Sequence, residues 1–252
     1  MKKGIVYFHQ GWSDIINSLS LVTYYSNIYD EVKVIMREDS REIFDYFIRD
    51  KNNVEALYFN KQYLDTNSFY STLDKNCDLL FHGYHDFMRN DKYKGSFNRS
   101  IYFVEGFYKF YDIEYMIRVD GFIFKRDHIL ENRFYDEFVK KHGEKYVLYH
   151  DDPDRNIIID FNKSDKFSYV NLNDISNNIF EVVKVLENSM EVYITDSIWA
   201  TFCYLLDAKY NIFSGRKVNL YSFSDRSGSC ISDKSINRLE PINLENWIIN
   251  HK

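Results

Sequence analysis

The sequence contains few cysteines, which limits how the chain can be cross-linked. Its three cysteines, Cys77, Cys203 and Cys230, lie far apart along the chain. This number and spacing indicate neither a disulfide framework nor a paired-cysteine metal site. The seven histidines also lack the HExxH spacing, or a similar one, that binds metal. We therefore expect a reduced protein that holds no metal and no cofactor.

Long apolar runs and an excess of positive charge are missing as well. Asp, Glu, Lys or Asn interrupts every apolar run after a few residues, so the sequence predicts neither a signal peptide nor a transmembrane span. The formal net charge of -6 argues against sequence-independent nucleic-acid binding, which needs a basic surface. With 45% hydrophobic and 28% charged residues, the 252-residue chain is typical of a soluble globular protein. We expect it in the cytoplasm.

Short apolar runs alternate along the chain with segments of helical periodicity. The apolar runs predict strands at 4–9, 31–36, 54–59, 77–83, 145–150, 167–172, 190–195, 210–213 and 218–223. The helical periodicity starts at Asp14 and recurs at 40–50, 99–113, 126–143, 178–188, 196–206 and 243–250, with Gly143 as a predicted C-terminal cap. Alternation at this spacing is typical of βαβ units in a parallel sheet.

This pattern predicts an α/β protein made of two Rossmann-like β/α/β domains. We expect an N-terminal domain over residues 1–116, a helical connector over 117–144 and a C-terminal domain over 145–252, whose last helix is free to pack back on the N-terminal domain. In open parallel sheets, ligands bind beyond the carboxyl ends of the strands. The residues that follow the predicted strands are therefore the candidates for function.

Polar and aromatic residues follow the first predicted strand in the sequence HQGWSD. Ser13 and Asp14 are both suitable residue types for the N-cap of the following helix. Asp14 is alternatively suited to act as a general base. Capping is the commoner role of a single aspartate, but a cap needs no imidazole, amide or indole beside it. Gly11 permits a tight turn or the close approach of a ligand. We expect a ligand around Asp14, against His9, Gln10, Gly11, Trp12 and Ser13.

Three further strand ends carry candidate residues. The sequence YHDDPDR is compatible with a ligand-binding turn, with a plain turn, and with a metal site for which no further carboxylates can be identified. At YITDSIW, hydroxyls and free helix amides suit a diphosphate, and simple helix capping is the alternative. At FHGYHDF, rings and imidazoles suit sugar stacking. The candidates are His150, Asp151 and Arg155; Thr195, Asp196, Ser197 and Trp199; and His82, Tyr84 and His85.

Two of these segments together resemble a known family. The sequence GWSDIINSLSLV, directly after the first strand, resembles the GxGDxxxxxP opening of the heptosyltransferase-like (ADP-heptose:LPS heptosyltransferase) glycosyltransferases, which have the two-domain GT-B architecture. The sequence VVKVLENSMEVYITDSIWATFCYLL resembles their late segment, in which a strand ends in Asp-Ser at the donor pocket. Trp12 and Ser13 replace a small residue and a glycine of the family, and Ile198 replaces another glycine. The chain thus resembles a short, divergent member.

The resemblance implies a GT-B-like fold with a cleft between its two domains. It also implies metal-independent, inverting transfer of a sugar from a nucleotide-sugar donor to a glycan or lipid-linked glycan acceptor of the capsule or lipopolysaccharide type. Asp14 matches the family's catalytic aspartate, which takes the proton of the acceptor hydroxyl. The acceptor is then expected around Asp14 and the segment 82–85, and the donor around the segments 150–155 and 195–199. A lipid-linked acceptor would bring the protein to the inner face of the membrane.

Two other function classes compete with transfer. A protein of the same fold that binds a nucleotide sugar or a glycan without catalysis is the first alternative, favoured by the short chain and the replaced glycines. Another nucleotide-dependent enzyme, such as a kinase or a reductase, is the second. Against it, the sequence has no GxxxxGK[ST], and no GxGxxG follows a strand.

Overall fold

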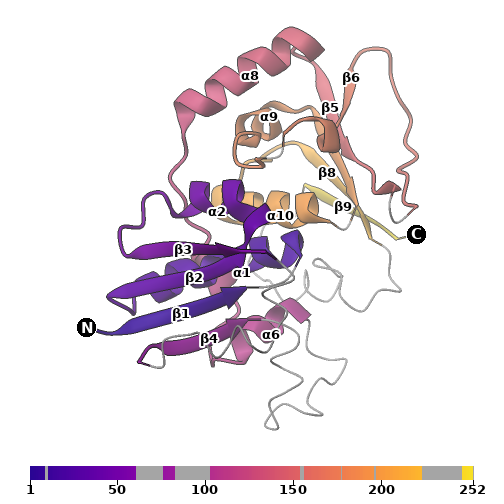
Figure 1. Cartoon of the computed structure of the whole chain (residues 1–252). Coiled ribbons are helices and arrows are strands. Elements are labelled where there is room, and N and C mark those ends of the chain that lie inside the picture. Colours follow the sequence, from indigo (N-terminus) through magenta and orange to yellow (C-terminus); the bar gives the residue numbers. More distant parts are fainter. Residues whose placement is uncertain are drawn as a thin grey trace. The chain divides into compact units, whose positions relative to one another are not determined.

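Two parallel β-sheets form the framework of the protein (Figure 1). The computed structural model describes residues 1–8, 11–60, 76–82, 103–153, 156–176, 178–195, 197–222 and 246–251. The chain divides into two compact units, Met1–Lys125 and Arg126–Lys252, each with one of the sheets. The division falls within the range 117–144, for which the sequence predicts a connector. Each unit is described on its own.

The first unit contains a four-stranded sheet in the order β3-β2-β1-β4, and every neighbouring pair is parallel. Helix α1 packs on β1 and β2, whereas α2 packs on β3. The elements are β1 (Lys3–Phe8), α1 (Trp12–Ser26), β2 (Glu31–Arg37), the 3-10 turn η1 (Glu38–Ser40), α2 (Arg41–Ile48), β3 (Val54–Phe59), β4 (Asp78–His82), α6 (Phe103–Lys109) and α7 (Ile117–Asp120).

The central strand β1 explains the first apolar run of the sequence. Val6 pairs with Val34 on one side and with Leu80 on the other, and all three side chains are buried. The residues on the opposite face of β1, Ile5 and Tyr7, are buried too. A strand covered on both faces has no reason to alternate apolar and polar residues. The predicted strand and its parallel neighbours are confirmed.

The second unit contains a five-stranded parallel sheet in the order β6-β5-β7-β8-β9. The predicted cap of α8 is confirmed: Gly143 follows its last turn with a positive φ of 82°. The elements are α8 (His128–His142), β5 (Tyr146–His150), β6 (Ser168–Asn171), the 3-10 turn η3 (Leu172–Asp174), α9 (Val183–Asn188), β7 (Glu191–Thr195), α10 (Ile198–Tyr210), β8 (Lys217–Ser222) and β9 (Trp247–His251).

Two predicted elements of the second unit are wrong. The strand expected at 210–213 is instead the end of α10 and a turn, in which Asn211 adopts a left-handed conformation and its N–H bonds to the carbonyl of Asp207. The segment 243–250 is expected to be a helix, but its described residues belong to strand β9, which pairs with β8. The indole of Trp247 donates a hydrogen bond of 2.7 Å to the Asp207 carboxylate. The open edge of β8 and this buried bond favour the strand, and helical periodicity cannot reveal either.

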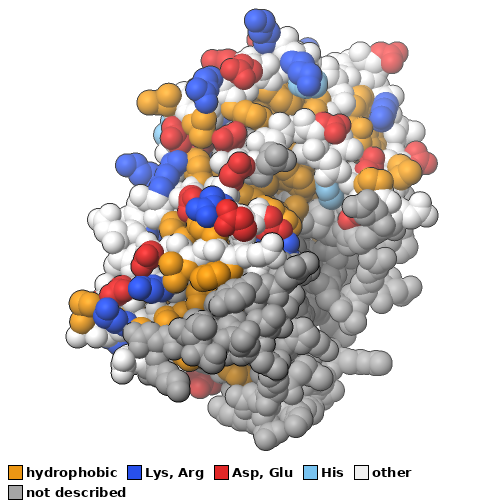
Figure 2. All heavy atoms as spheres, in the orientation of Figure 1, with side chains coloured by type: hydrophobic (Ala, Val, Ile, Leu, Met, Phe, Trp, Pro, Cys, Tyr) orange, Lys and Arg blue, Asp and Glu red, His pale blue; other side chains and the backbone are white. Residues whose placement is uncertain are grey.

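Charged side chains on the surface are mixed in sign. On the face shown in Figure 2, Lys and Arg side chains lie among Asp and Glu side chains, and the described residues form no continuous basic area there. None of the helices in the described part of the chain is both long and apolar enough to cross a membrane.

The contact between α7 and α1 carries the first prediction. A Cβ atom on Gly121 would lie 2.7 Å from the carbonyl oxygen of Ser20 in α1 and 2.9 Å from that of Ile117. Because backbone atoms cannot move aside, Gly121→Ala is expected to destabilise the fold by about 1–3 kcal/mol in urea denaturation. Gly11→Ala is the control, since a Cβ there meets nothing within 4 Å and the φ of -67° suits any residue. Equal stability of the two variants would contradict the close packing.

Candidate functional site

The order of strands marks one place in each sheet where a ligand is expected. In the first sheet the chain runs outward from β1 to β3 and then returns to add β4 on the other side of β1. In the second sheet the same reversal occurs between β5 and β7. Loops diverge at such switch points, and ligands of open α/β sheets bind there, beyond the carboxyl ends of the strands. Candidate residues lie at both.

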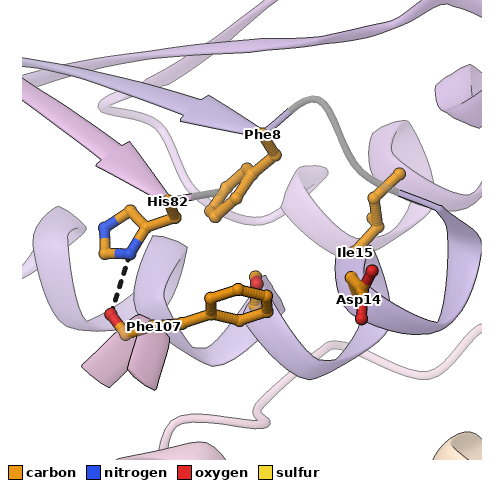
Figure 3. Close-up of a pocket in the computed structure, with 6 residues that line it drawn as sticks. Phe8, Asp14, Ile15, His82 and Phe107 are labelled. Carbon is orange, nitrogen blue, oxygen red and sulfur yellow. Dashed lines mark hydrogen bonds between the residues drawn. The ribbon is translucent and has the colours of Figure 1, made fainter. Parts of the chain in front are cut away.

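A small pocket lies at the switch point of the first sheet (Figure 3). It is a narrow crevice, and the space between its lining atoms, about 140 Å³, is partly open to solvent. Phe8 ends β1, His82 ends β4, and α1 and α6 supply the remaining wall. The lining residues are Phe8, Asp14, Ile15, Ser18, His82 and Phe107. The fold therefore brings Asp14 and His82, which are far apart in the sequence, to one pocket.

Asp14 lies in the first turn of α1 but does not cap the helix. The N-cap residue is Gly11, with no side-chain capping bond, so the alternative in which Ser13 or Asp14 is the N-cap is wrong. A helix N-terminus favours the charged form of a carboxylate. Burial opposes this and prevails, raising the pKa of Asp14 from 3.8 to about 6. Such a carboxylate is ionised at neutral pH and is still basic enough to take a proton from a substrate.

His82 is held by hydrogen bonds at both ring nitrogens. Its Nδ1 lies 2.9 Å from the carbonyl oxygen of Phe107, which can only accept, so Nδ1 carries the proton. The hydroxyl of Tyr25 then donates to Nε2, also at 2.9 Å. Burial lowers the pKa of His82 from 6.5 to about 3, so the ring is neutral. His82 thus presents its ring to the pocket, because its nitrogens are engaged inside the protein.

The switch point of the second sheet joins His150 to the start of α10. His150 ends β5 and is 6% exposed. Its Nδ1 lies 3.1 Å from the hydroxyl of Ser197, the N-cap residue of α10. Because that hydroxyl bonds to His150, it makes no capping bond to the helix amides. Thr195, the last residue of β7, is completely buried, and its hydroxyl has no hydrogen-bond partner among the described residues. The arrangement is suited to an anion.

The other candidates divide into three groups. Gly11 is exposed and Trp12 half-buried at the start of α1. Asp151 accepts a hydrogen bond of 2.7 Å from the N–H of Ile159, and Trp199 is buried beside Phe202 within its own unit. Outside the described residues lie His9, Gln10, Tyr84, His85, Arg155 and Asp196, together with the side chain of Ser13.

The sequence analysis missed four of the residues that line the pocket. Ile15 and Ser18 are on α1, and Ser18 follows Asp14 by one helical turn, so helical periodicity was a signal that could have found it. Phe8 was assigned to the strand only. Phe107 comes from α6, and nothing in its sequence indicates the pocket. Among the described residues, no group of three His, Cys, Asp or Glu side chains is arranged to hold a metal ion.

Comparison with known proteins identifies the fold. No protein-family model and no curated protein sequence matches the chain. A solved glycosyl transferase of family 9 from Veillonella parvula matches with a TM-score of 0.53 and 6% identity, over 99% of this chain and 87% of that chain. E. coli heptosyltransferase WaaC with ADP gives a TM-score of 0.46 and 11% identity, over 99% and 90% of the two chains. The structure of the same heptosyltransferase with ADP-2-deoxy-2-fluoro heptose gives a TM-score of 0.47 and 10% identity, over 98% of this chain and 92% of that chain. The chain has the two-domain α/β fold of the family 9 glycosyl transferase, which confirms the predicted GT-B-like fold.

Proposed function

We propose that the protein is a glycosyltransferase, which moves a sugar from a nucleotide-sugar donor to a hydroxyl of a surface glycan of the capsule or lipopolysaccharide type. One observation carries the proposal: the switch point of the first sheet holds Asp14, a carboxyl group whose pKa burial raises to about 6. The fold shared with a family 9 glycosyl transferase supports this use of the site. Fold alone does not assign an activity, so the chemistry of the site has to carry the argument.

In the proposed reaction Asp14 acts as the general base. It accepts the proton of the acceptor hydroxyl while that oxygen forms a bond to the anomeric carbon of the donor. The bond from this carbon to the diphosphate breaks, and the diphosphate leaves with the electron pair. A single displacement of this kind inverts the anomeric carbon. General-base assistance is worth about 10²–10⁴-fold in rate.

The donor is proposed to bind at the switch point of the second sheet. The first amides of α10 carry no side-chain cap from Ser197, and a helix N-terminus stabilises a developing anion. In the proposed complex the ring of His150, at the adjacent strand end, bonds to a phosphate oxygen of the donor. These groups stabilise the leaving diphosphate without a metal ion. We keep the cytoplasmic location expected from the sequence, at the inner face of the membrane if the acceptor is lipid-linked.

The donor site is tested by thermal denaturation with nucleoside diphosphates and their sugar conjugates. One nucleotide is expected to stabilise the wild type, by about 2.7 kcal/mol at a hundredfold excess over its Kd. His150→Gln is expected to weaken this effect about tenfold in Kd, since a hydrogen bond to a charged group contributes about 1.5–3 kcal/mol. His128→Gln, in the exposed first turn of α8, is the control.

Three results would count against the proposal in different ways. No stabilisation by any nucleotide would contradict a donor site. Equal binding by His150→Gln and the wild type would remove His150 from it. Stabilisation without any sugar transfer to glycan acceptors would favour the alternative, a binding protein of the same fold in which Ile198 replaces the family's glycine.

A further inference from the structure

The last strand, β9, forms an outer edge of the second sheet (Figure 1). The N–H of Val218 in β8 bonds to the carbonyl of Asn246, which fixes the alternation of backbone groups along β9. The backbone groups of Ile248 therefore point to β8 as well, whereas those of its neighbours Trp247 and Ile249 point away from the sheet. Among the residues that the structure describes, none bonds to these outward groups. Such an edge is able to pair with a further strand.

The sequence of β9 lacks the features that protect an edge strand. Charged residues, proline and short length are the common means of protection. Of the other outer strands, β3 carries the exposed Glu55, β4 begins with Asp78, and β6 has only four residues. Strand β9 has the sequence WIINH, which contains no Lys, Arg, Asp, Glu or Pro. The side chain of Ile248 is also 42% exposed, so β9 offers both free backbone groups and apolar surface.

Strand β9 is complementary to a second copy of itself. Two identical edges pair about a two-fold axis, and the strands then run antiparallel. With the axis beside Ile248, the outward groups of Trp247 in each copy exchange N–H···O bonds with those of Ile249 in the other. The exposed Ile248 side chains lie opposite each other, at the closer of the two antiparallel spacings. The net charge of the chain is -6, but β9 brings no acidic side chain to this contact.

We propose that β9 is a self-association surface, through which two copies of the chain pair antiparallel with Ile248 against Ile248 of the partner subunit. The pairing joins the two five-stranded sheets into one. Strand β8 separates β9 from the switch point between β5 and β7, so this inference does not depend on the proposed function. A contact of one short strand is smaller than the about 1,200–2,000 Å² of stable interfaces, so we expect a weak dimer that dissociates on dilution.

The first part of the test is sedimentation of the full chain at micromolar to several hundred micromolar concentration. The wild type is expected to change from monomer to dimer and to grow no further, because pairing uses the edge. Ile248→Lys sets two lysines opposite each other and is expected to weaken the dimer about tenfold or more. Ile158→Lys is the matched control, since Ile158 is 69% exposed in the same unit but belongs to no strand.

Three results of this experiment would overturn the proposal. They are a wild type that stays monomeric at every concentration, one that grows beyond a dimer, and an Ile248→Lys variant that dimerises as Ile158→Lys does. Thermal denaturation of both variants checks their folding, and equal Tm values are expected because both replaced side chains are exposed.

The second part needs no substitution and follows amide hydrogen exchange of the wild type in dilute and concentrated solution. The amides of Trp247 and Ile249 are expected to exchange more slowly when the protein is concentrated, because the partner strand bonds to them. The amide of Ile248 points to β8 and is expected to exchange slowly in both solutions. A dimer in which Trp247 and Ile249 exchange as fast as in the monomer would place the contact elsewhere and would contradict the pairing.

Discussion

Asp14→Asn is expected to reduce sugar transfer by about 10²–10⁴-fold and, at the same time, to stabilise the fold at neutral pH. The two effects have one cause. In the proposed reaction the carboxylate acts as a base because burial makes its charged form unfavourable, and the same burial destabilises the folded protein whenever Asp14 is ionised. Asparagine has nearly the same shape but neither the charge nor the basicity.

The sign of the stability effect follows from the two pKa values. The pKa of Asp14 is about 6 in the folded protein and about 3.8 when unfolded, so between these values the folded state binds more protons. Stability is therefore lost as the pH rises through this window, and the loss at pH 7 is up to about 3 kcal/mol. Asp14→Asn is expected to recover this amount above pH 6 and none of it below pH 3.8.

The measurement combines urea denaturation with an assay of nucleoside diphosphate release. Wild-type transfer is expected to fall as the pH drops below about 6, where Asp14 becomes protonated. Glu42→Gln is the matched control, since Glu42 lies in the first turn of α2 but is exposed. Undiminished transfer by Asp14→Asn would show that Asp14 is not the base. Unchanged stability at pH 7 would show that the carboxylate is not desolvated.

The second large effect is expected from His82, which makes the fold sensitive to acid. Its pKa is about 3 in the folded protein and 6.5 when unfolded, so at intermediate pH only the unfolded chain is protonated there. Stability is fully present above pH 6.5 and is lost as the pH falls, by about 1.4 kcal/mol for each pH unit. By pH 3 this amounts to roughly 4–5 kcal/mol.

Asp14 and His82 therefore act in opposite directions over the same range. Between pH 3.8 and 6 the contribution of His82 rises with pH while that of Asp14 falls, so the two nearly cancel in the wild type. Asp14→Asn is expected to uncover the dependence on His82 between pH 6.5 and 4. His82→Gln is expected to be less stable at pH 7, because Tyr25 and Phe107 lose part of their hydrogen bonding. Its stability should then fall as the pH rises from 3.8 to 6.

Urea denaturation at pH 4, 5, 6 and 7 on the wild type, Asp14→Asn, His82→Gln and the double variant checks this. Subtracting one protein's plot of unfolding free energy against pH from another's cancels the contributions of all groups other than Asp14 and His82. The double variant is expected to lack both slopes. An Asp14→Asn curve parallel to that of the wild type would contradict the opposing contributions.

Much of the fold follows from local pattern. The runs around β1 and β5 are apolar because both faces of these central strands are covered, and α8 ends at Gly143 because a positive φ suits glycine. The wrong predictions concern segments whose local pattern suits both a helix and a strand. The segment that forms β9 is short and apolar, and its strand depends on pairing with β8 and on the bond from Trp247 to Asp207. Both partners are distant in sequence.

The sequence by itself determined the α/β class, the parallel sheets and the place of Asp14 at the start of the helix that follows the first strand, because these depend on periodicity and chain order. Only the tertiary structure decided the pKa of Asp14. Its raised pKa comes from burial beside Phe8 and Phe107, and these walls belong to elements that folding brings together. Desolvation and hydrogen-bond satisfaction depend on all the neighbours in space, and one-dimensional pattern does not contain them.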